Sequence, residues 1–328
     1  MKLIFFGIII GTLIVNSESK DNINGHSFVL LKNQRCETSN LLAILSNVRS
    51  RQICLGECVA LAQCARVNYA KSSMTCELIP SNETTCSNTF DTNWNHAHFL
   101  CKNQYKRDCQ TLRENGCRQN GVYTIKPDPT KASFDVFCDM HDGGWTVIQK
   151  RYDGSVEFHG KNWAEYRLGF GTVSTEYWLG NSKINRITNS ANYQIKFDML
   201  PSDNEWSDAI YSYFSIKNAT GDFEMTIGPY VGGTAPDSIG GSTAANMLLN
   251  GMKFSTVDRD NDLATGACTN PYGGSGWWYN SCTGVNLNGN YSFDGIYHDR
   301  HLGVKWGGLT PYDGPSLMAT AMKLKRQS

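Results

Sequence analysis

The sequence predicts an α+β protein in two parts: a small disulfide-rich module and a larger domain of mixed sheets, short helices and long ordered loops. Seven of the 12 cysteines lie between Cys36 and Cys101, and five are spread over Cys109–Cys282. The second half is rich in Gly, Trp, Tyr and Asn and has few long helical patterns. The 328 residues suffice for two domains of about 100–200 residues each. We expect a module over 24–102, a polar linker over 103–108 and a domain over 109–328.

The first 17 residues have the pattern of a signal peptide. Lys2 precedes an apolar run, Leu3–Val15, which is too short to cross a membrane and is followed by small polar residues. No other stretch approaches 18 apolar residues, so membrane insertion is not expected. The mature protein is therefore predicted to be secreted and extracellular.

The charge balance excludes a general electrostatic attraction to nucleic acid. Lys plus Arg and Asp plus Glu both number 30, so the protein has no net field. In an exported protein, 12 cysteines indicate a disulfide framework more than a zinc site. Asn-X-Ser/Thr sequences predict glycosylation at Asn82, Asn218 and Asn290.

The first half is expected to attach a helix to a sheet. Phe28–Leu31 predicts a short strand, and Ser50–Gln63 predicts a helix with Cys54 and Cys58 on one face. The order Cys54-x3-Cys58-x5-Cys64, then Tyr69, then Cys76-Glu-Leu, closed by Cys101, resembles the PAN/apple module. This resemblance implies the pairs Cys36–Cys101, Cys54–Cys76 and Cys58–Cys64, and it leaves Cys86 without a partner. Such modules bind proteins or glycans.

An acidic loop lies within Ser255–Thr283. Asp258, Asp260 and Asp262 alternate along the sequence and are followed by Gly266 and by two cysteines, Cys268 and Cys282. Alternating carboxylates with inward-turned carbonyls can coordinate calcium, which takes several oxygens at about 2.3–2.6 Å. An EF-hand is excluded, because its glycine and glutamate positions are occupied by Leu263 and Thr269. Taken alone, the motif is better explained as a solvated acidic turn, so the calcium interpretation needs support from the rest of the sequence.

The second half resembles the fibrinogen C-terminal-like domain over about 220 residues. The motifs that carry the resemblance occur in the order Arg107-Asp-Cys109, Gly121-Val-Tyr-Thr-Ile125, Val136-Phe-Cys-Asp-Met140, Gly143–Arg151, Asp153–Phe158, Tyr177-Trp-Leu-Gly-Asn181, Asn250–Thr256, Gly276-Trp-Trp278 and Asn286-Leu-Asn-Gly289. The resemblance implies one calcium ion (Ca2+), held by the carboxylates of Asp260 and Asp262 and the carbonyls of Ala264 and Gly266. Asp258 would support this set from outside.

The same resemblance implies two disulfides, Cys109–Cys138 and Cys268–Cys282. The second closes a loop of about 15 residues, which in the chain-entropy model contributes roughly 3 kcal/mol. Cys86 and Cys117 then remain. We expect these two to join the domains within one molecule, but pairing between molecules, which gives a covalent homo-oligomer, stays open.

Ficolins and tachylectins, the acetyl-binding relatives, imply a ligand pocket beside the calcium. A cis peptide is expected at Ser281–Cys282, and Tyr272 matches a pocket tyrosine, although a half-buried loop aromatic is its alternative role. Thr283 and Arg300 depart from the acetyl-binding pattern, where a histidine and an aromatic residue are usual. His301 and Tyr312 complete the predicted pocket. Because a guanidinium suits carboxylate or sulfate, the ligand is expected to be an acetylated or anionic glycan.

Two classes of function fit these features of the sequence. The first is a calcium-dependent lectin of the innate-immune pattern-recognition type. The alternative is a protein-binding or receptor-binding module, as in angiopoietins and fibrinogen. An enzyme is not expected, because the sequence contains no GxSxG elbow, HExxH motif or P-loop. Trp277 and Trp278 are expected in the core rather than in contact with sugars.

Overall fold

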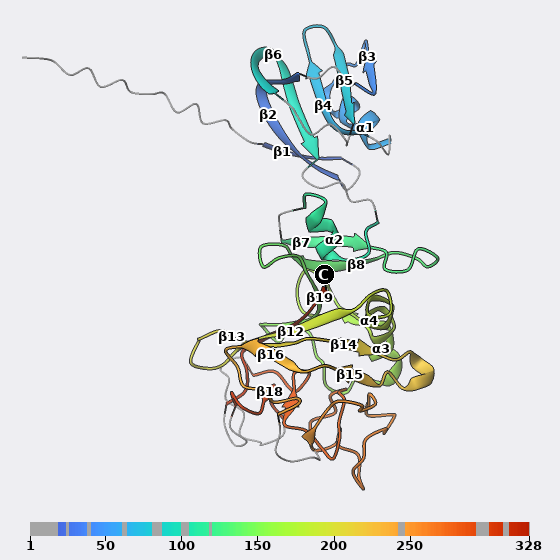
Figure 1. Cartoon of the computed structure of the whole chain (residues 1–328), viewed down its shortest axis with the longest axis vertical. Helices are drawn as coiled ribbons and strands as arrows, with labels where there is room; N and C mark the ends of the chain where they lie inside the picture. Colours follow the sequence, from blue (N-terminus) through green and yellow to red (C-terminus); the bar gives the residue numbers. More distant parts are fainter. Residues whose placement is uncertain are drawn as a thin grey trace, which may run out of the picture. The chain divides into compact units, whose positions relative to one another are not determined.

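A computed structural model describes residues 19–23, 26–37, 41–60, 64–80, 87–99, 105–117, 120–241, 247–292, 302–310 and 315–327. The protein divides into two compact units, residues 1–102 and 103–328 (Figure 1). Both contain sheets with a few short helices, which confirms the predicted α+β class. Among the described residues, no helix is long and apolar enough to cross a membrane. The predicted signal peptide lies outside the described residues.

The first unit is a six-stranded antiparallel sheet covered by one helix. Its strands lie in the order β1-β2-β6-β4-β5-β3. The elements are β1 (Ser19–Ile23), β2 (His26–Glu37), β3 (Ala43–Leu45), α1 (Arg51–Ala60), β4 (Cys64–Ala70), β5 (Thr75–Pro80) and β6 (Ser87–Phe99). The predicted strand at Phe28–Leu31 is part of β2, and the predicted helix corresponds to α1.

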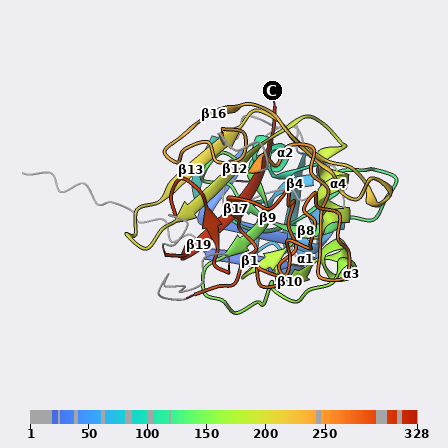
Figure 2. The same ribbon diagram turned by 90° about the horizontal axis from the view of Figure 1, so that it is seen from below.

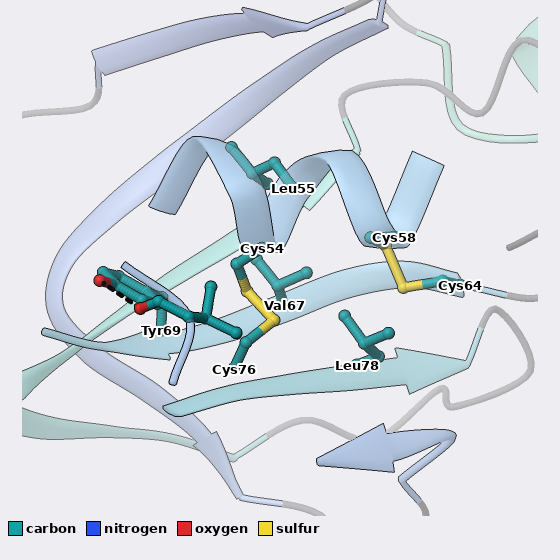
Figure 3. Packing of buried hydrophobic residues seen from close by; sticks show 9 residues of the cluster. Cys54, Leu55, Cys58, Cys64, Val67, Tyr69, Cys76 and Leu78 are labelled. Carbon is teal, nitrogen blue, oxygen red and sulfur yellow. Dashed lines mark hydrogen bonds between the residues drawn. A yellow bond between two sulfur atoms is a disulfide. The ribbon is translucent and has the colours of Figure 1, made fainter. Parts of the chain in front are cut away.

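Two disulfides attach α1 to the sheet (Figure 3). Cys54 and Cys58 lie four residues apart on the buried face of α1, and they bond to Cys76 of β5 and Cys64 of β4. Leu55, Val67 and Leu78 belong to the same buried apolar cluster as these cysteines. A helix of only ten residues is marginal alone, so these bridges and the apolar contacts fix its position.

The second unit is built on a nine-stranded sheet (Figures 1 and 2). Its main path is β10-β11-β9-β19-β12-β13-β16, and β7 and β8 extend from β9. The strands are β7 (Gly121–Ile125), β8 (Phe134–Asp139), β9 (Trp145–Arg151), β10 (Phe170–Gly171), β11 (Tyr177–Trp178), β12 (Tyr193–Leu200), β13 (Ser207–Tyr211), β16 (Tyr230–Gly233) and β19 (Ala319–Arg326). Burial alternates along β12, as expected for a strand with one face on the core.

Short elements complete this unit. They are the helices α2 (Cys109–Glu114), α3 (Trp163–Leu168) and α4 (Asn181–Thr188), the 3₁₀ turn η1 (Ala219–Gly221), the pair β14 (Phe214–Ile216) and β15 (Met225–Ile227), and the pair β17 (Val285–Asn286) and β18 (Lys305–Trp306). A capping box starts α3, because Asn162 accepts a hydrogen bond from the Glu165 amide and Glu165 accepts one from the Asn162 amide.

The predicted linker is partly built into the second unit. The Lys106 carbonyl accepts a hydrogen bond from the amide of Lys126 at 2.7 Å. Asp108 is 1% exposed and caps α2, because its carboxylate accepts from the amide of Thr111. At the end of 103–108, the polar residue Asp108 therefore serves as a helix cap and is not part of a free connector.

Four of the expected disulfides lie within the described part of the protein: Cys54–Cys76, Cys58–Cys64, Cys109–Cys138 and Cys268–Cys282. Cys36 and Cys117 are also disulfide-bonded. Their expected partners, Cys101 and Cys86, lie outside the described residues, so both of these pairings stay predictions.

Candidate functional site

The acidic loop leaves the core at an isolated bridge between Ser255 and Trp277. The amide and carbonyl of each residue bond to the other at 2.9 and 3.1 Å. Asn261 turns the loop back, because its side-chain amide donates to the Phe254 carbonyl at 2.7 Å and its backbone amide donates to Oγ of Ser255 at 3.0 Å. These bonds therefore anchor the beginning of the loop, and the predicted ligands Asp262, Ala264 and Gly266 follow this anchor in the sequence.

Asp262 organises the centre of the loop. Its Oδ1 accepts a hydrogen bond from the amide of Ala264 at 2.9 Å, and its Oδ2 accepts from the amide of Cys268 at 2.7 Å. Asp260 lies close by, and its Oδ1 accepts from the amide of Asp262 at 3.2 Å. Burial and the neighbouring Asp260 carboxylate raise the pKa of Asp262, against the lowering effect of the two amides. Two carboxylates are thus held close together, where a cation would relieve their repulsion.

The remaining predicted ligands are backbone oxygens. No described residue donates a backbone hydrogen bond to the carbonyl of Ala264 or Gly266. Among the described residues, no group of three or more His, Cys, Asp or Glu side chains forms a metal cluster. A set of two carboxylates and two carbonyls nevertheless fits the oxygen preference of calcium, which also accepts water ligands.

Asp258 connects the acidic loop to helix α3. Its Oδ1 accepts hydrogen bonds from the amide of Trp163, at the start of α3, and from the hydroxyl of Thr256, at 2.8 and 2.7 Å. Burial disfavours its charged form, but these bonds and the nearby Arg259 outweigh burial and lower its pKa. Asp258 therefore stabilises the support of the loop.

The predicted pocket segment is joined to the acidic loop. Cys268 and Cys282 are bonded with their Cα atoms 5.5 Å apart, and the peptide between Ser281 and Cys282 is cis, as expected. The amide of Leu263 donates to the Asn280 carbonyl at 2.9 Å. Consequently the acidic loop and residues 280–283 form one connected structure.

Two predicted pocket residues face inward. Tyr272 is 6% exposed, and its hydroxyl donates to the Thr283 carbonyl at 2.8 Å. Thr283 is 3% exposed, and its own hydroxyl donates to the Val285 carbonyl at 2.8 Å. Both therefore position the backbone behind residues 281–283, which favours the structural alternative for Tyr272. Arg300, His301 and Tyr312 lie outside the described residues.

A buried polar network beneath this segment was not predicted. The side-chain amide of Asn286 donates to Oγ of Ser275 at 2.8 Å and to the hydroxyl of Tyr279 at 3.3 Å. The Tyr279 hydroxyl also donates to the Ser275 carbonyl at 2.8 Å. Burial raises the pKa of Tyr279 well above its ordinary value, so it stays neutral. The Asn286-Leu-Asn-Gly289 motif was the only sequence signal for this network.

Trp277 and Trp278 are buried, as predicted, at 1% and 0% exposure. The indole nitrogen of Trp278 donates to the Phe223 carbonyl at 2.8 Å. Gly276, which precedes them, packs against a ring, because a Cβ atom there would lie 2.6 Å from Cε2 of Tyr166. The Gly-Trp-Trp motif is thus part of the framework.

The predicted glycosylation sites differ in their surroundings. Asn218 is exposed and caps η1, where its side chain accepts a hydrogen bond from the amide of Gly221. Asn290 is half-buried, and a Cβ atom at Gly273 would lie 2.8 Å from its Nδ2. Asn82 lies outside the described residues.

Two family models match the protein. The model of the C-terminal globular domain of fibrinogen beta and gamma chains matches residues 105–327, and the model of the PAN domain matches residues 26–105. The first covers well over half of the sequence. The two matches meet at Tyr105, close to the boundary between the two structural units.

Curated relatives share the larger domain. Fibrinogen-like protein 1 of Mus musculus is 41% identical over 213 residues, which are 62% of this protein and 67% of the relative. Ryncolin-4 of Cerberus rynchops is 42% identical over 202 residues, 61% of this protein and 55% of the relative. The fibrinogen gamma chain of Xenopus laevis is 38% identical, and the match spans 65% of this protein and only 51% of that one. None of these three names denotes an enzyme.

Solved structures agree with the sequence comparison. The fibrinogen-like globe domain of human ANGPTL2 is 36% identical, with a TM-score of 0.63, over 68% of this protein and 100% of that domain. A lamprey fibrin D-dimer in complex with the peptide Gly-His-Arg-Pro-amide has the same identity and TM-score over 68% of this protein and 76% of that one. The protein therefore belongs to the family defined by the C-terminal globular domain of fibrinogen beta and gamma chains, here following a PAN domain.

Proposed function

We propose that this is a secreted, calcium-dependent recognition protein of the innate-immune type, which binds glycans through the surface formed by the acidic loop and residues 281–283. The observation that carries the proposal is the joining of these two segments by Cys268–Cys282 and by the hydrogen bond from Leu263 to Asn280. A metal bound to one segment would hold the other in place. Secretion rests on the predicted signal peptide and on the disulfides.

Calcium would be held by the carboxylates of Asp260 and Asp262 and the carbonyls of Ala264 and Gly266. The ion would supply positive charge that offsets the repulsion between the two carboxylates. The proposal is supported by the orientation of Asp262, whose carboxylate accepts hydrogen bonds from the amides of Ala264 and Cys268.

The expected ligands are glycans that carry acetyl or anionic groups. Support comes from the resemblance to ficolins and tachylectins and from Arg300, which replaces the aromatic residue expected there. A guanidinium forms paired hydrogen bonds with a carboxylate or a sulfate, whereas it offers less to an acetyl methyl group.

A protein or peptide ligand is the second candidate. Tyr272 and Thr283 direct their hydroxyls into the fold, so these two groups are engaged by the protein itself. The lamprey fibrin structure is a complex with a peptide ligand, which shows that a relative of this fold accepts one. Here, a receptor would bind through the same loops without specificity for sugars.

Calcium binding is tested by titration calorimetry of the purified protein. The double variant Asp260→Asn, Asp262→Asn is expected to lose calcium binding, because both charged ligands are removed. The matched control is Asp258→Asn, which removes a charge two residues away and weakens the contact with α3. It should lower the melting temperature but retain calcium affinity. Equal affinity in the wild type and the double variant would rule out the proposed ligand set.

Ligand class is tested on arrays of glycans and peptides, each probed with calcium and with chelator. Binding to acetylated or anionic glycans that disappears with chelator supports the lectin, and Arg300→Ala should reduce binding of the anionic ones selectively. Binding that survives complete removal of calcium would contradict the mechanism. Calcium-dependent binding of peptides alone would establish the second candidate.

A further inference from the structure

A depression of about 320 Å³ lies on the second unit where β12 and β13 meet. It is lined by Lys196, Asp198, Trp206, Ser207 and Asp208. These residues come from two neighbouring strands and from the end of the connection between them. None of them belongs to the acidic loop or to residues 280–283.

The depression lies on the face of the sheet that points away from the core. Asp198 of β12 is directly opposite Asp208 of β13, and its other neighbour across the strands is Ala321 of β19. The intervening residues Phe197 and Ala209 are buried on the opposite face. Two like charges directly opposite each other destabilise a sheet. Here the pair forms part of a surface depression and needs compensation by a cation.

Lys196 supplies only part of that compensation. Its Nζ lies 2.9 Å from Asp142, 3.4 Å from Asp198 and 3.7 Å from Asp208. Burial opposes its charged form, but these carboxylates outweigh burial and raise the pKa of Lys196. Asp142 and Asp198 also lie within ion-pair distance of Lys323, and Asp208 accepts hydrogen bonds from the amide and hydroxyl of Thr234 at 3.2 and 3.3 Å.

A second lysine, Lys323, forms ion pairs with neighbouring carboxylates of the same cluster. It pairs with Asp139 at 2.6 Å and also contacts Asp198. Lys150 of β9 lies in the same cross-strand row as Asp198, with Ala321 between them, and Lys325 follows Lys323 along β19. Both lysines contact aromatic rings. The cation that lines the depression thus remains Lys196, and its side chain is only 16% exposed.

The lining of the depression includes an exposed aromatic side chain. Trp206 is 59% exposed, although large aromatic side chains usually gain much from burial. It ends the connection from Pro201 to Trp206, which also carries the exposed carboxylates Asp203 and Glu205. An indole face with carboxylates nearby is complementary to a flat cation.

We propose that this depression is a docking surface for an arginine-containing segment of a partner protein. The guanidinium would stack on Trp206, while its N–H groups bond to carboxylates of the Asp198–Asp208 pair or to Glu205. Arginine suits the surface better than lysine, because its planar group can stack and form paired hydrogen bonds at once. Charge complementarity favours a basic protein segment over nucleic acid or an anionic glycan, which the carboxylates would repel.

The test measures binding of a fluorescent probe, the blocked peptide Gly-Arg-Gly-Arg-Gly, to the full-length protein by fluorescence anisotropy. The control peptide contains citrulline in place of arginine, which keeps the shape and removes the charge. We expect the arginine peptide to bind, the citrulline peptide to bind at least about tenfold more weakly, and added salt to weaken the interaction. Chelator should have no effect, which separates this surface from the acidic loop.

Substitutions at the depression test whether the arginine peptide binds there. Trp206→Ala should weaken binding about five- to tenfold, the range expected for loss of a cation–π contact, and Trp206→Phe should restore part of it. Glu205→Gln should have a smaller effect. Controls are Leu168→Ala, which removes another exposed apolar side chain, and Glu157→Gln, which removes another exposed carboxylate. Melting temperatures verify that each variant is folded.

Three outcomes would overturn the proposal. They are no binding of the arginine peptide, equal binding of the arginine and citrulline peptides, and unchanged binding by folded Trp206→Ala. The other possible occupant is a second copy of the protein, which analytical sedimentation would detect as self-association. Self-association that Trp206→Ala abolishes would assign the surface to this second copy, and the proposed partner would then be wrong.

Discussion

Glu176 shows how a single buried charge can order a loop. Its side chain is fully buried, and Oε1 accepts hydrogen bonds from the amides of Tyr152, Asp153 and Gly154 at 2.6–3.0 Å. Oε2 accepts from the amide of Val156 at 3.0 Å. A carboxylate is an acceptor only, so it can satisfy all four donors at the turn that follows β9.

Glu176→Gln is expected to destabilise the protein although the side chain keeps its size. The amide would place N–H groups against backbone donors, which leaves buried groups without partners. The free energy of unfolding should fall by about 2–3 kcal/mol, measured by chemical denaturation. Glu157→Gln, an exposed change in the same loop, is the control and should be nearly neutral. Equal stability of the two variants would contradict this role of Glu176.

Asp139 is expected to make stability dependent on acid. Burial disfavours its charge, but the hydrogen bond and charge of Lys323 outweigh burial, so its pKa lies below the ordinary 3.8. A lowered pKa means that the unfolded state binds protons first, so stability rises with pH. Asp139→Asn should therefore cost about 1–3 kcal/mol at neutral pH.

This difference between Asp139→Asn and the wild type should be present above the unfolded pKa and shrink as pH falls through the folded value. Calorimetric melting at several pH values measures it. The exposed change Asp203→Asn serves as the control. A difference in melting temperature that stays constant from neutral pH into acid would show that Asp139 does not act through its charge.

At the scale of elements, the candidate site is a set of loops held by regular structure. The capping box orients α3, and the amide of its first residue, Trp163, donates to Asp258. The disulfide between Cys268 and Cys282 then fixes the other side of the acidic loop. Neither strand order nor helix packing alone would place these loops.

Cys268→Ser with Cys282→Ser should lower both stability and calcium affinity. The bridge joins residues 14 apart, and in the chain-entropy model such a loop contributes about 3 kcal/mol. Calcium affinity should fall at least about tenfold, because the loop ends are no longer held. Titration calorimetry and thermal melting measure the two effects. Cys54→Ser with Cys76→Ser, in the other unit, is the control and should leave calcium affinity unchanged.

Local sequence patterns predicted part of this arrangement. The i, i+4 spacing of Cys54 and Cys58 predicted a helix fixed to a sheet, because the spacing depends on near neighbours in the sequence. The acidic triplet likewise indicated a calcium loop, which stays a prediction. The inward direction of Tyr272 was not predictable, since it depends on the carbonyl of Thr283, which is brought there by loop geometry. The docking depression depends on strand register, which no local pattern reveals.

At the scale of the whole molecule, the protein divides into two compact units, and Cys117 of the second is disulfide-bonded. We expect its partner to be Cys86 of the same molecule. A protease site inserted between Asn103 and Gln104 tests this. After cleavage, the two halves should stay together on a non-reducing gel and separate on reduction. Cys117→Ser should separate without reductant. A ladder of higher masses that collapses to monomer on reduction would indicate pairing between molecules.

The position of β19 in the sheet constrains the order in which the second unit can fold. This strand, Ala319–Arg326, lies between β9 and β12 and pairs with both, although it comes last of the three in the sequence. On a translating ribosome, β9 and β12 emerge long before the strand that joins them. Until β19 has been made, the apolar faces of these strands stay exposed to solvent. Nascent proteins with exposed apolar surface are prone to aggregate or to bind chaperones. The sheet closes only when β19 arrives, so this unit cannot complete its fold before Arg326 has been synthesised.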